Sequence, residues 1–184
     1  MGSAVDLRTA SAADAEAVAT LHADSWRRHY RGAFADTFLD GDLVADRLAV
    51  WSERLRSPKP DQVTIVADVD DEPVGFVHVV LDDDVRWGSF IENLHVTNAL
   101  RRGGIGSALM TRAAQVVAER GRTGGLYLWT LEQNTAAQAF YVAHGGSPIE
   151  RAYAAEPGGV PGRLNGRPAK LRMAWANAHD LRRR

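Results

Sequence analysis

The chain has 184 residues, with 22 basic and 23 acidic side chains, a net charge of −1 and no cysteine. This length fits a single domain over residues 1–184, and 45% apolar with 24% charged residues excludes a disordered, collagenous or coiled-coil chain. Without cysteine there is no disulfide, thiolate nucleophile or cysteine-bound metal, so a cytoplasmic location is the simplest expectation. The near-zero charge gives no general attraction to nucleic acid or membranes, and no apolar run is long enough to cross a bilayer.

The N-terminal third predicts two helices. Ser11 to Asp14 has the spacing of a capping box, and the apolar residues that follow it at helical spacing predict a helix over about residues 12–28. A second helix is expected over about residues 37–56, ended by the proline-containing string at 57–60.

An acidic β-hairpin is expected next. Two β-branched runs, at 63–67 and 74–81, are joined by the turn string at 70–73. Residues 61–92 contain nine acids and one base. These acids indicate either a solvated face or an acidic cleft that attracts a cation.

The C-terminal half alternates strands and helices. Strands are expected at 90–96, 126–131 and 170–175, and helices along an apolar stripe at 108–117 and over 135–144, where Gly145-Gly146 stops the second one. Residues 154–169 form a long turn-rich loop, and loops of that length are more often functional than filler. The element order β-αα-ββ-β-α-β-α-(β)-β predicts an α/β fold, with a mixed sheet covered on both faces by helices.

The strongest local signal is a glycine-rich turn between a strand and a helix. It reads Arg101-Arg102-Gly103-Gly104-Ile105-Gly106-Ser107. Glycines let a ligand approach the backbone, and the free amides at a helix start attract phosphate oxygens. The pattern is neither a dinucleotide-binding fingerprint, since the sixth position is Leu109, nor a Walker loop, since no lysine follows a glycine. Tight packing alone is the alternative explanation for these glycines.

Three strings together resemble the GNAT N-acetyltransferase superfamily. They are Leu94-His95-Val96, then Arg101-x-x-Gly104-x-Gly106, then Asn134-x-x-Ala137-x-x-Phe140-Tyr141-x-x-x-Gly145. The resemblance is strong over residues 90–146. It implies a mostly antiparallel mixed sheet, splayed between the fourth and fifth strands with helices on both faces, and acetyl-CoA (coenzyme A) as the cofactor.

The resemblance also implies which residues bind acetyl-CoA. Backbone groups of the fourth strand would pair with the pantetheine arm, the glycine-rich turn would hold the pyrophosphate, and the later helix would pack beside the arm. The cofactor-binding residues are then Leu94, His95, Val96, Arg101, Arg102, Gly103, Gly104, Ile105, Gly106, Ser107, Asn134, Ala137, Phe140 and Tyr141.

Tyr141 and Glu92 are the catalytic candidates. A phenol beside the sulfur can protonate a departing thiolate, and packing alone is the other role open to Tyr141. An alkylammonium must lose a proton before it can attack. Glu92, expected on the same strand face as Val96, is the candidate base or water-ordering group, although ion pairing or substrate attraction would also explain it. His78, on the neighbouring strand, is the second candidate.

The end of the first helix is aromatic and basic. Trp26, Tyr30 and Phe34 are four residues apart, which suits a wall of the acceptor pocket or a buried helical stripe equally well. With His78 and Glu92 they form the predicted substrate-binding set. The six histidines are scattered without a paired spacing, so no metal is expected.

The leading hypothesis is an acetyl-CoA-dependent N-acetyltransferase that acts on a small-molecule amine by direct attack in a ternary complex. The acidic stretch 61–92 favours a small cationic acceptor. The alternatives are an acyl-CoA-binding regulatory module without turnover, a transferase acting on a peptide or protein amine, and one using aminoacyl-tRNA as donor. Membrane association is not expected, nucleic acid is an unfavoured partner, and a homodimer is left open.

Overall fold

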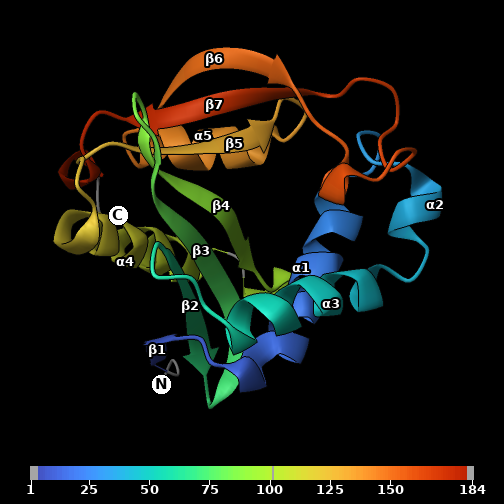
Figure 1. Ribbon diagram of the computed structural model, residues 1–184, viewed down its shortest axis with the longest axis horizontal. Coiled ribbons are helices and arrows are strands. Elements are labelled where there is room, and N and C mark those ends of the chain that lie inside the picture. Colours follow the sequence, from blue (N-terminus) through green and yellow to red (C-terminus); the bar gives the residue numbers. More distant parts are fainter. Residues whose placement is uncertain (1–3, 101, 182–184) are drawn as a thin grey trace.

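The computed structural model describes residues 4–100 and 102–181, which form one seven-stranded sheet with helices on both faces (Figure 1). The strands are β1 (Val5–Thr9), β2 (Gln62–Val69), β3 (Glu72–Asp84), β4 (Gly88–Val96), β5 (Leu126–Leu131), β6 (Ser147–Tyr153) and β7 (Ala169–Trp175). The α-helices are α1 (Ala15–His29), α2 (Asp36–Leu39), α3 (Leu43–Arg56), α4 (Ile105–Arg120) and α5 (Thr135–Ala143). None of the described helices is long and apolar enough to cross a membrane.

The strand order is β1-β2-β3-β4-β5-β7-β6, and every neighbouring pair is antiparallel except β4 and β5. That parallel pair covers only three residue pairs and ends at Ile91 with Leu128. Beyond it β4 continues to Val96 and β5 to Leu131 without pairing to each other. The predicted splay between the fourth and fifth strands is therefore confirmed, and we call this divergence the splay.

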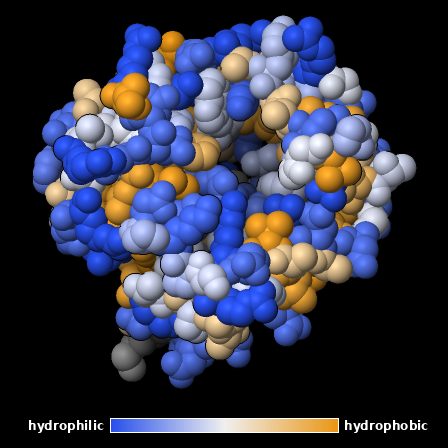
Figure 2. All heavy atoms as spheres, viewed as in Figure 1, coloured by the Kyte–Doolittle hydropathy of each residue, from blue (hydrophilic) through white to orange (hydrophobic). Residues whose placement is uncertain are grey.

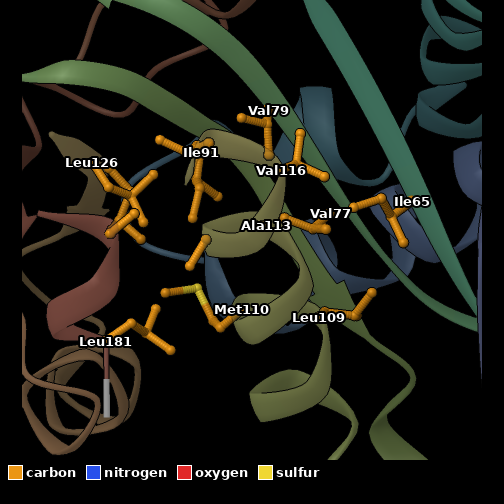
Figure 3. Packing of buried hydrophobic residues seen from close by; sticks show 14 of the residues in the cluster. Ile65, Val77, Val79, Ile91, Leu109, Met110, Ala113, Val116, Leu126 and Leu181 are labelled. Atoms are coloured by element: carbon orange, nitrogen blue, oxygen red, sulfur yellow. The ribbon is translucent and has the colours of Figure 1, made fainter. Parts of the chain in front are cut away.

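Alternating side chains of the sheet pack on two different helical layers, because successive residues of a strand point to opposite faces. On one face, Val77 and Ile91 pack with Leu109 and Met110 of α4 (Figure 3). On the other face, Phe76 packs with Trp51 of α3 and with α1. We call these the α4 side and the α1 side of the sheet.

A β-bulge in β4 changes the direction of Glu92. His78 pairs with Asn93 but the next β3 residue, Val79, pairs with Ile91, so Glu92 is an extra residue. Its carboxylate lies on the α1 side and binds Arg54 of α3, whereas Val96 packs on the α4 side. The expectation that Glu92 shares a face with Val96 is wrong, because the extra residue shifts the two-residue alternation.

Most predicted elements are confirmed with longer bounds, and one is divided. The expected 37–56 helix is two helices, α2 and α3, separated at residues 40–42. Asp40 and Gly41 leave helical pairing there, and a Cβ at Gly41 would lie 2.9 Å from the Thr37 carbonyl oxygen. This break turns the chain, so the aromatic end of α1, α2 and the start of α3 pack around one cluster.

Residues 154–168, which we call the strap, join β6 to β7 and lie against the link between α1 and α2. The Ala35 amide donates to the Arg163 carbonyl (2.9 Å), and the Asn165 amide donates to the Ala33 carbonyl (2.8 Å). The Glu156 carboxylate accepts three strap amides, including those of Arg163 and Leu164. The long loop is thus tied to the molecule by main-chain bonds.

Candidate active site

The glycine-rich turn begins α4 with open backbone. Gly104 precedes the helix with φ +83°, a left-handed conformation that glycine adopts without strain. A Cβ at Gly104 would meet no atom within 4 Å, so the space beside this turn is open. No side chain caps the helix and no acid occupies its first turn. The first amides of α4 therefore face outward without an intrahelical acceptor, which suits an anion.

The rest of the turn is exposed. Arg102 has φ +69°, and the Gly103 amide donates to the Leu100 carbonyl (3.3 Å), so it is already engaged. Arg101, predicted to lie near phosphates, falls outside the described residues. Ile105 is buried in the main core, which anchors the start of the helix.

The first turn of α4 is bonded to the end of α5. His144, which the sequence analysis missed, is 3% exposed. Its Nδ1 lies 2.8 Å from the Phe140 carbonyl oxygen, and its Nε2 lies 2.9 Å from Ser107 Oγ. Since a carbonyl only accepts, the neutral ring carries its proton on Nδ1, and the Ser107 hydroxyl donates to Nε2. A Cβ at Gly106 would lie 3.4 Å from the Phe140 ring.

Helix α5 also positions the candidate acid. Tyr141 is 9% exposed and packs edge-on against Trp175. Burial, and then interaction with the Tyr30 phenol, raise the pKa of Tyr141 above its usual value. Asn134 caps α5: its Oδ1 accepts a hydrogen bond from the Ala137 amide at 3.2 Å. The side chain of Asn134 therefore has a structural role at the start of this helix.

The three predicted residues at the end of β4 alternate between the two sides. Leu94 and Val96 pack against the main core on the α4 side. His95 is 8% exposed on the α1 side, with its Nδ1 2.7 Å from Ser25 Oγ. Burial lowers the pKa of His95 to about 3. Past Ile91, the β4 edge that faces the splay has no partner strand among the described residues, which leaves main chain free for an added extended segment.

The aromatic residues at the end of α1 form a buried cluster. Trp26 is 8% exposed and Phe34 6% exposed, with their ring centroids 5.1 Å apart. Tyr30 is partly exposed and packs on both rings. Burial raises the pKa of Tyr30 to about 12. Trp26 and Phe34 are thus core residues in this structure, and Tyr30 is the member whose phenol interacts electrostatically with that of Tyr141.

Glu92 is bound by a guanidinium. Both of its oxygens accept from Arg54, one of them at 3.0 Å. His78 Nε2 lies 3.9 Å from Glu92 Oε2, and His78 Nδ1 lies 2.8 Å from Thr64 Oγ1. Burial, followed by the Arg54 charge, lowers the pKa of His78 to about 4. His78 is therefore neutral at pH 7.

A buried polar group that the sequence analysis missed surrounds His22. Its Nδ1 accepts from Trp51 Nε1 (3.0 Å), its ring stacks on His95 with centroids 4.8 Å apart, and its Nε2 lies 3.4 Å from Asn93. Burial, followed by the nearby His95, lowers the pKa of His22 well below its usual value. The sequence could place His22 on the apolar stripe of a helix, but it could not identify its partners, because they come from α1, α3 and β4.

The acids of the stretch 61–92 do not form a cleft. Asp70, Asp71 and Glu72 lie at the β2–β3 turn, and Asp82, Asp83 and Asp84 lie at the opposite end of the long strand β3. Asp82 binds the amides of residues 122 and 123, and Asp68 binds Arg8. The expected acidic cleft is wrong, because a 13-residue strand separates the two groups.

The splay lies between two differently built surfaces. Figure 2 shows a recess near the middle of the face viewed in Figure 1, between the region of β5 and that of α1. Beside the start of α4, a pocket of about 390 Å³ is lined by Leu7, Gly104, Ser107, Ala108, Thr111, Arg112 and Gln115. The arrangement offers open amides on one side and ionisable side chains on the other.

Comparison with known proteins gives a consistent result. Residues 16–145 match the sequence profile of the Acetyltransferase (GNAT) family. No curated protein matches the chain significantly.

Solved structures are similar over nearly the whole chain. A GCN5-related N-acetyltransferase from Rhodopseudomonas palustris has 20% identity and a TM-score of 0.71, covering 95% of this chain and 96% of that one. The PaiA N-acetyltransferase of Thermoplasma acidophilum, with coenzyme A, has 15% identity and a TM-score of 0.66 over 94% and 99%. Arabidopsis thaliana NAA60, with a bisubstrate analogue, has 18% identity and a TM-score of 0.66 over 94% and 98%. These likenesses show a shared fold.

Proposed function

The chain belongs to the GNAT acetyltransferase family, and from that premise we propose that it transfers the acetyl group of acetyl-CoA to a primary amine of a small molecule by direct attack in a ternary complex. The absence of cysteine removes the commonest acyl-enzyme nucleophile and supports direct attack.

The observation that carries this proposal is the junction of α4 and α5 beside the splay. Ser107 of α4 is bonded to His144 after α5, and Gly106 lies against Phe140. The open amides at the start of α4 and the phenol of Tyr141 therefore belong to one rigid unit. The proposed transfer would use both, the first for the coenzyme phosphates and the second for the departing sulfur.

The described residues fit acetyl-CoA, which supplies an acetyl group activated as a thioester. The amides from Gly104 to Ser107 would hold the pyrophosphate, because the turn is open and no acid opposes an anion there. The free edge of Leu94 to Val96 would pair with the pantetheine arm. Ala137 and Phe140 pack beside this core and would line the arm.

Tyr141 would act as the acid. Because burial raises its pKa, the phenol keeps its proton at neutral pH and has it ready for a thiolate. The same burial disfavours an unprotonated thiolate and so raises the pKa of the coenzyme thiol as well. Transfer of the proton from the phenol to the sulfur therefore stays favourable. Overall, the C–N bond forms as the C–S bond breaks, and the ammonium nitrogen loses two protons. One is released to solvent, and the other replaces the proton that Tyr141 gives to the sulfur.

Glu92 would order the water that takes the amine's proton. Its two oxygens are already held by Arg54, which fixes the carboxylate in place. His78, neutral at pH 7 and 3.9 Å away, is the second group at this position.

The strap supports a small acceptor. It crosses from β6 to β7 and is bonded by main chain to the link between α1 and α2, next to Phe34 and Tyr30. A segment bonded in this way leaves less room beside the aromatic cluster, which favours a small amine over a peptide. A homodimer and a cytoplasmic location stay predictions.

The test is release of free thiol from acetyl-CoA across a panel of amines, amino acids, aminoglycosides and short peptides. We expect turnover with at least one small amine, and a 10²- to 10⁴-fold lower kcat for Tyr141→Phe with nearly unchanged acetyl-CoA affinity, on typical acid–base magnitudes. Calorimetric binding of acetyl-CoA without thiol release for any amine would favour a regulatory module. Wild-type kcat in Tyr141→Phe would remove the phenol from the mechanism.

A further inference from the structure

The α1 side of the splay carries more guanidinium than carboxylate groups. Asp46 pairs there with both Arg47 and Arg163, and Glu92 pairs with Arg54. Glu92 is taken up by Arg54, so Asp46 alone faces the other two cations. The neighbouring His22, His78 and His95 have lowered pKa values and add no charge at pH 7.

Arg47 is the buried member of this group. Its side chain is 9% exposed, and its guanidinium lies over the Trp26 ring, 4.6 Å from the centroid. Its Nε and Nη2 both reach Asp46 Oδ2, at 3.0 and 2.6 Å, while Arg163 takes Asp46 Oδ1 at 2.6 Å. One carboxylate therefore pairs with two guanidinium groups. A buried guanidinium that is only partly neutralised lowers the stability of the fold unless a further anion binds to it.

The remaining edge of Arg47 is available. Within residues 4–100 and 102–181, no group accepts a hydrogen bond from its Nη1. The only polar side-chain atoms there that are sealed from solvent without a partner are His78 Nε2 and Asn93 Oδ1. The free edge of Arg47 is therefore within reach of solvent, and of a solute.

The unpartnered His78 Nε2 is a second, independent observation. His78 and Asn93 are register partners on the α1 side, flanking the bulge at Glu92. His78 is 1% exposed, and buried polar atoms without partners are rare in folded proteins. Asn93 is accounted for, because His22 Nδ1 accepts from Trp51 and its protonated Nε2 then needs the Asn93 amide oxygen as acceptor. His78 Nε2 lies 3.9 Å from Oε2 of Glu92, and this partly exposed carboxylate is the acceptor that an entering ammonium can reach.

Resting on the proposed acetyl transfer, we propose that the acceptor is an amino acid, with its carboxylate bound by the free edge of Arg47 and its amino group directed toward Glu92, beside His78. A planar guanidinium matches a carboxylate in a way that a simple ammonium does not. The surplus positive charge also lowers the pKa of a nearby amine, which increases its neutral, attacking form. A purely cationic acceptor would be repelled.

The experiment compares matched acceptors in the thiol-release assay. Phenylalanine, phenylalaninamide and 2-phenylethylamine form one set, and alanine, alaninamide and ethylamine form another. We expect kcat/KM for the amino acid to exceed that of its amide and of the decarboxylated amine by about tenfold or more, the magnitude of a hydrogen bond to a charged group. Equal or higher values for the uncharged or cationic members overturn the inference. Preference for phosphoethanolamine over every amino acid overturns the carboxylate assignment.

Variants connect the preference to Arg47. In Arg47→Met the ratio of acid to amide falls to near one, and in Arg47→Lys it takes an intermediate value, because the charge stays and the planar fork is lost. Arg56→Met removes an exposed guanidinium from the same helix and keeps the wild-type ratio. Should Arg47→Met not fold, Arg47→Lys alone decides, and an unchanged ratio in it overturns the inference.

The two proposals fail in different ways. If no amine of any class releases thiol, the proposed acetyl transfer fails. If cationic or neutral amines are acetylated and amino acids are not, acetyl transfer stands and the amino-acid acceptor is rejected.

Discussion

The two surfaces that meet at the splay present different groups to a ligand: main-chain groups on the α4 side and side chains on the α1 side. The α4 side offers main chain: open amides after Gly104 and an unpaired β4 edge, fixed by Ser107 and His144. The α1 side offers side chains from α1, α3, β3 and β4, including neutral buried histidines and an ion pair at Glu92. A surface made of main chain suits a ligand that is the same for every family member, and one made of side chains suits a ligand that differs.

The first way to sharpen this comparison is acid pH, because only the α1 side holds several histidines with lowered pKa. His78 and His95 titrate near 4 and 3 in the fold, below the ordinary value of 6.5. Folding is not penalised by these histidines above pH 6.5, where they are neutral in both states. As pH falls below 6.5 the free energy of unfolding decreases, because the unfolded chain binds the protons first. We expect a loss of about 2 kcal/mol per histidine between pH 6.5 and 5.

Urea unfolding at pH 7, 6 and 5 measures this loss. His95→Asn should reduce the dependence of unfolding free energy on pH by the share of one histidine. His179→Gln, at an exposed site, should keep the wild-type dependence. Equal slopes in all three proteins would show that the buried histidines do not carry the acid sensitivity.

The second prediction breaks the α4 side alone. Gly104→Ala should lower the free energy of unfolding by about 1 to 2 kcal/mol, because alanine is strained at φ +83° and no clash adds to the cost. Acetyl-CoA affinity, measured by calorimetry, should also fall. Gly162→Ala is the matched control: Gly162 has φ +85° and equally open space, but lies in the strap. It should lose similar stability and keep acetyl-CoA affinity; equal loss of affinity in both variants would contradict the assignment of the turn.

The smallest expected effect concerns Glu92. Glu92→Gln should move the pH–rate profile toward alkaline values by on the order of one pH unit if the carboxylate orders the water that removes the proton. An unmoved profile assigns that role to His78 or solvent. A movement toward acid would mean that Glu92 acts mainly as the counter-charge of Arg54, because an unpaired guanidinium lowers the pKa of a nearby amine.

The sequence was informative where the structure depends on local signals. Strand and helix periodicity predicted nearly all elements, and the glycines at 104 and 106 marked the turn that begins α4. The division of the helix expected at 37–56 was missed, because the break at Gly41 contains no proline that would have marked it in the sequence. The face of Glu92 was wrong because a single bulged residue leaves no mark in the pattern.

Main-chain recognition can be read from the sequence because it depends on a few consecutive residues whose conformation is fixed locally, as at Gly104. The α1 side was decided only by the tertiary structure. His22, Arg47, Asn93 and Arg163 are up to 141 positions apart, and packing of α1, α3, β4 and the strap brings them together. The charge pattern along the sequence predicted an acidic cleft, but in the folded chain strand β3 carries its acids to opposite ends of the sheet.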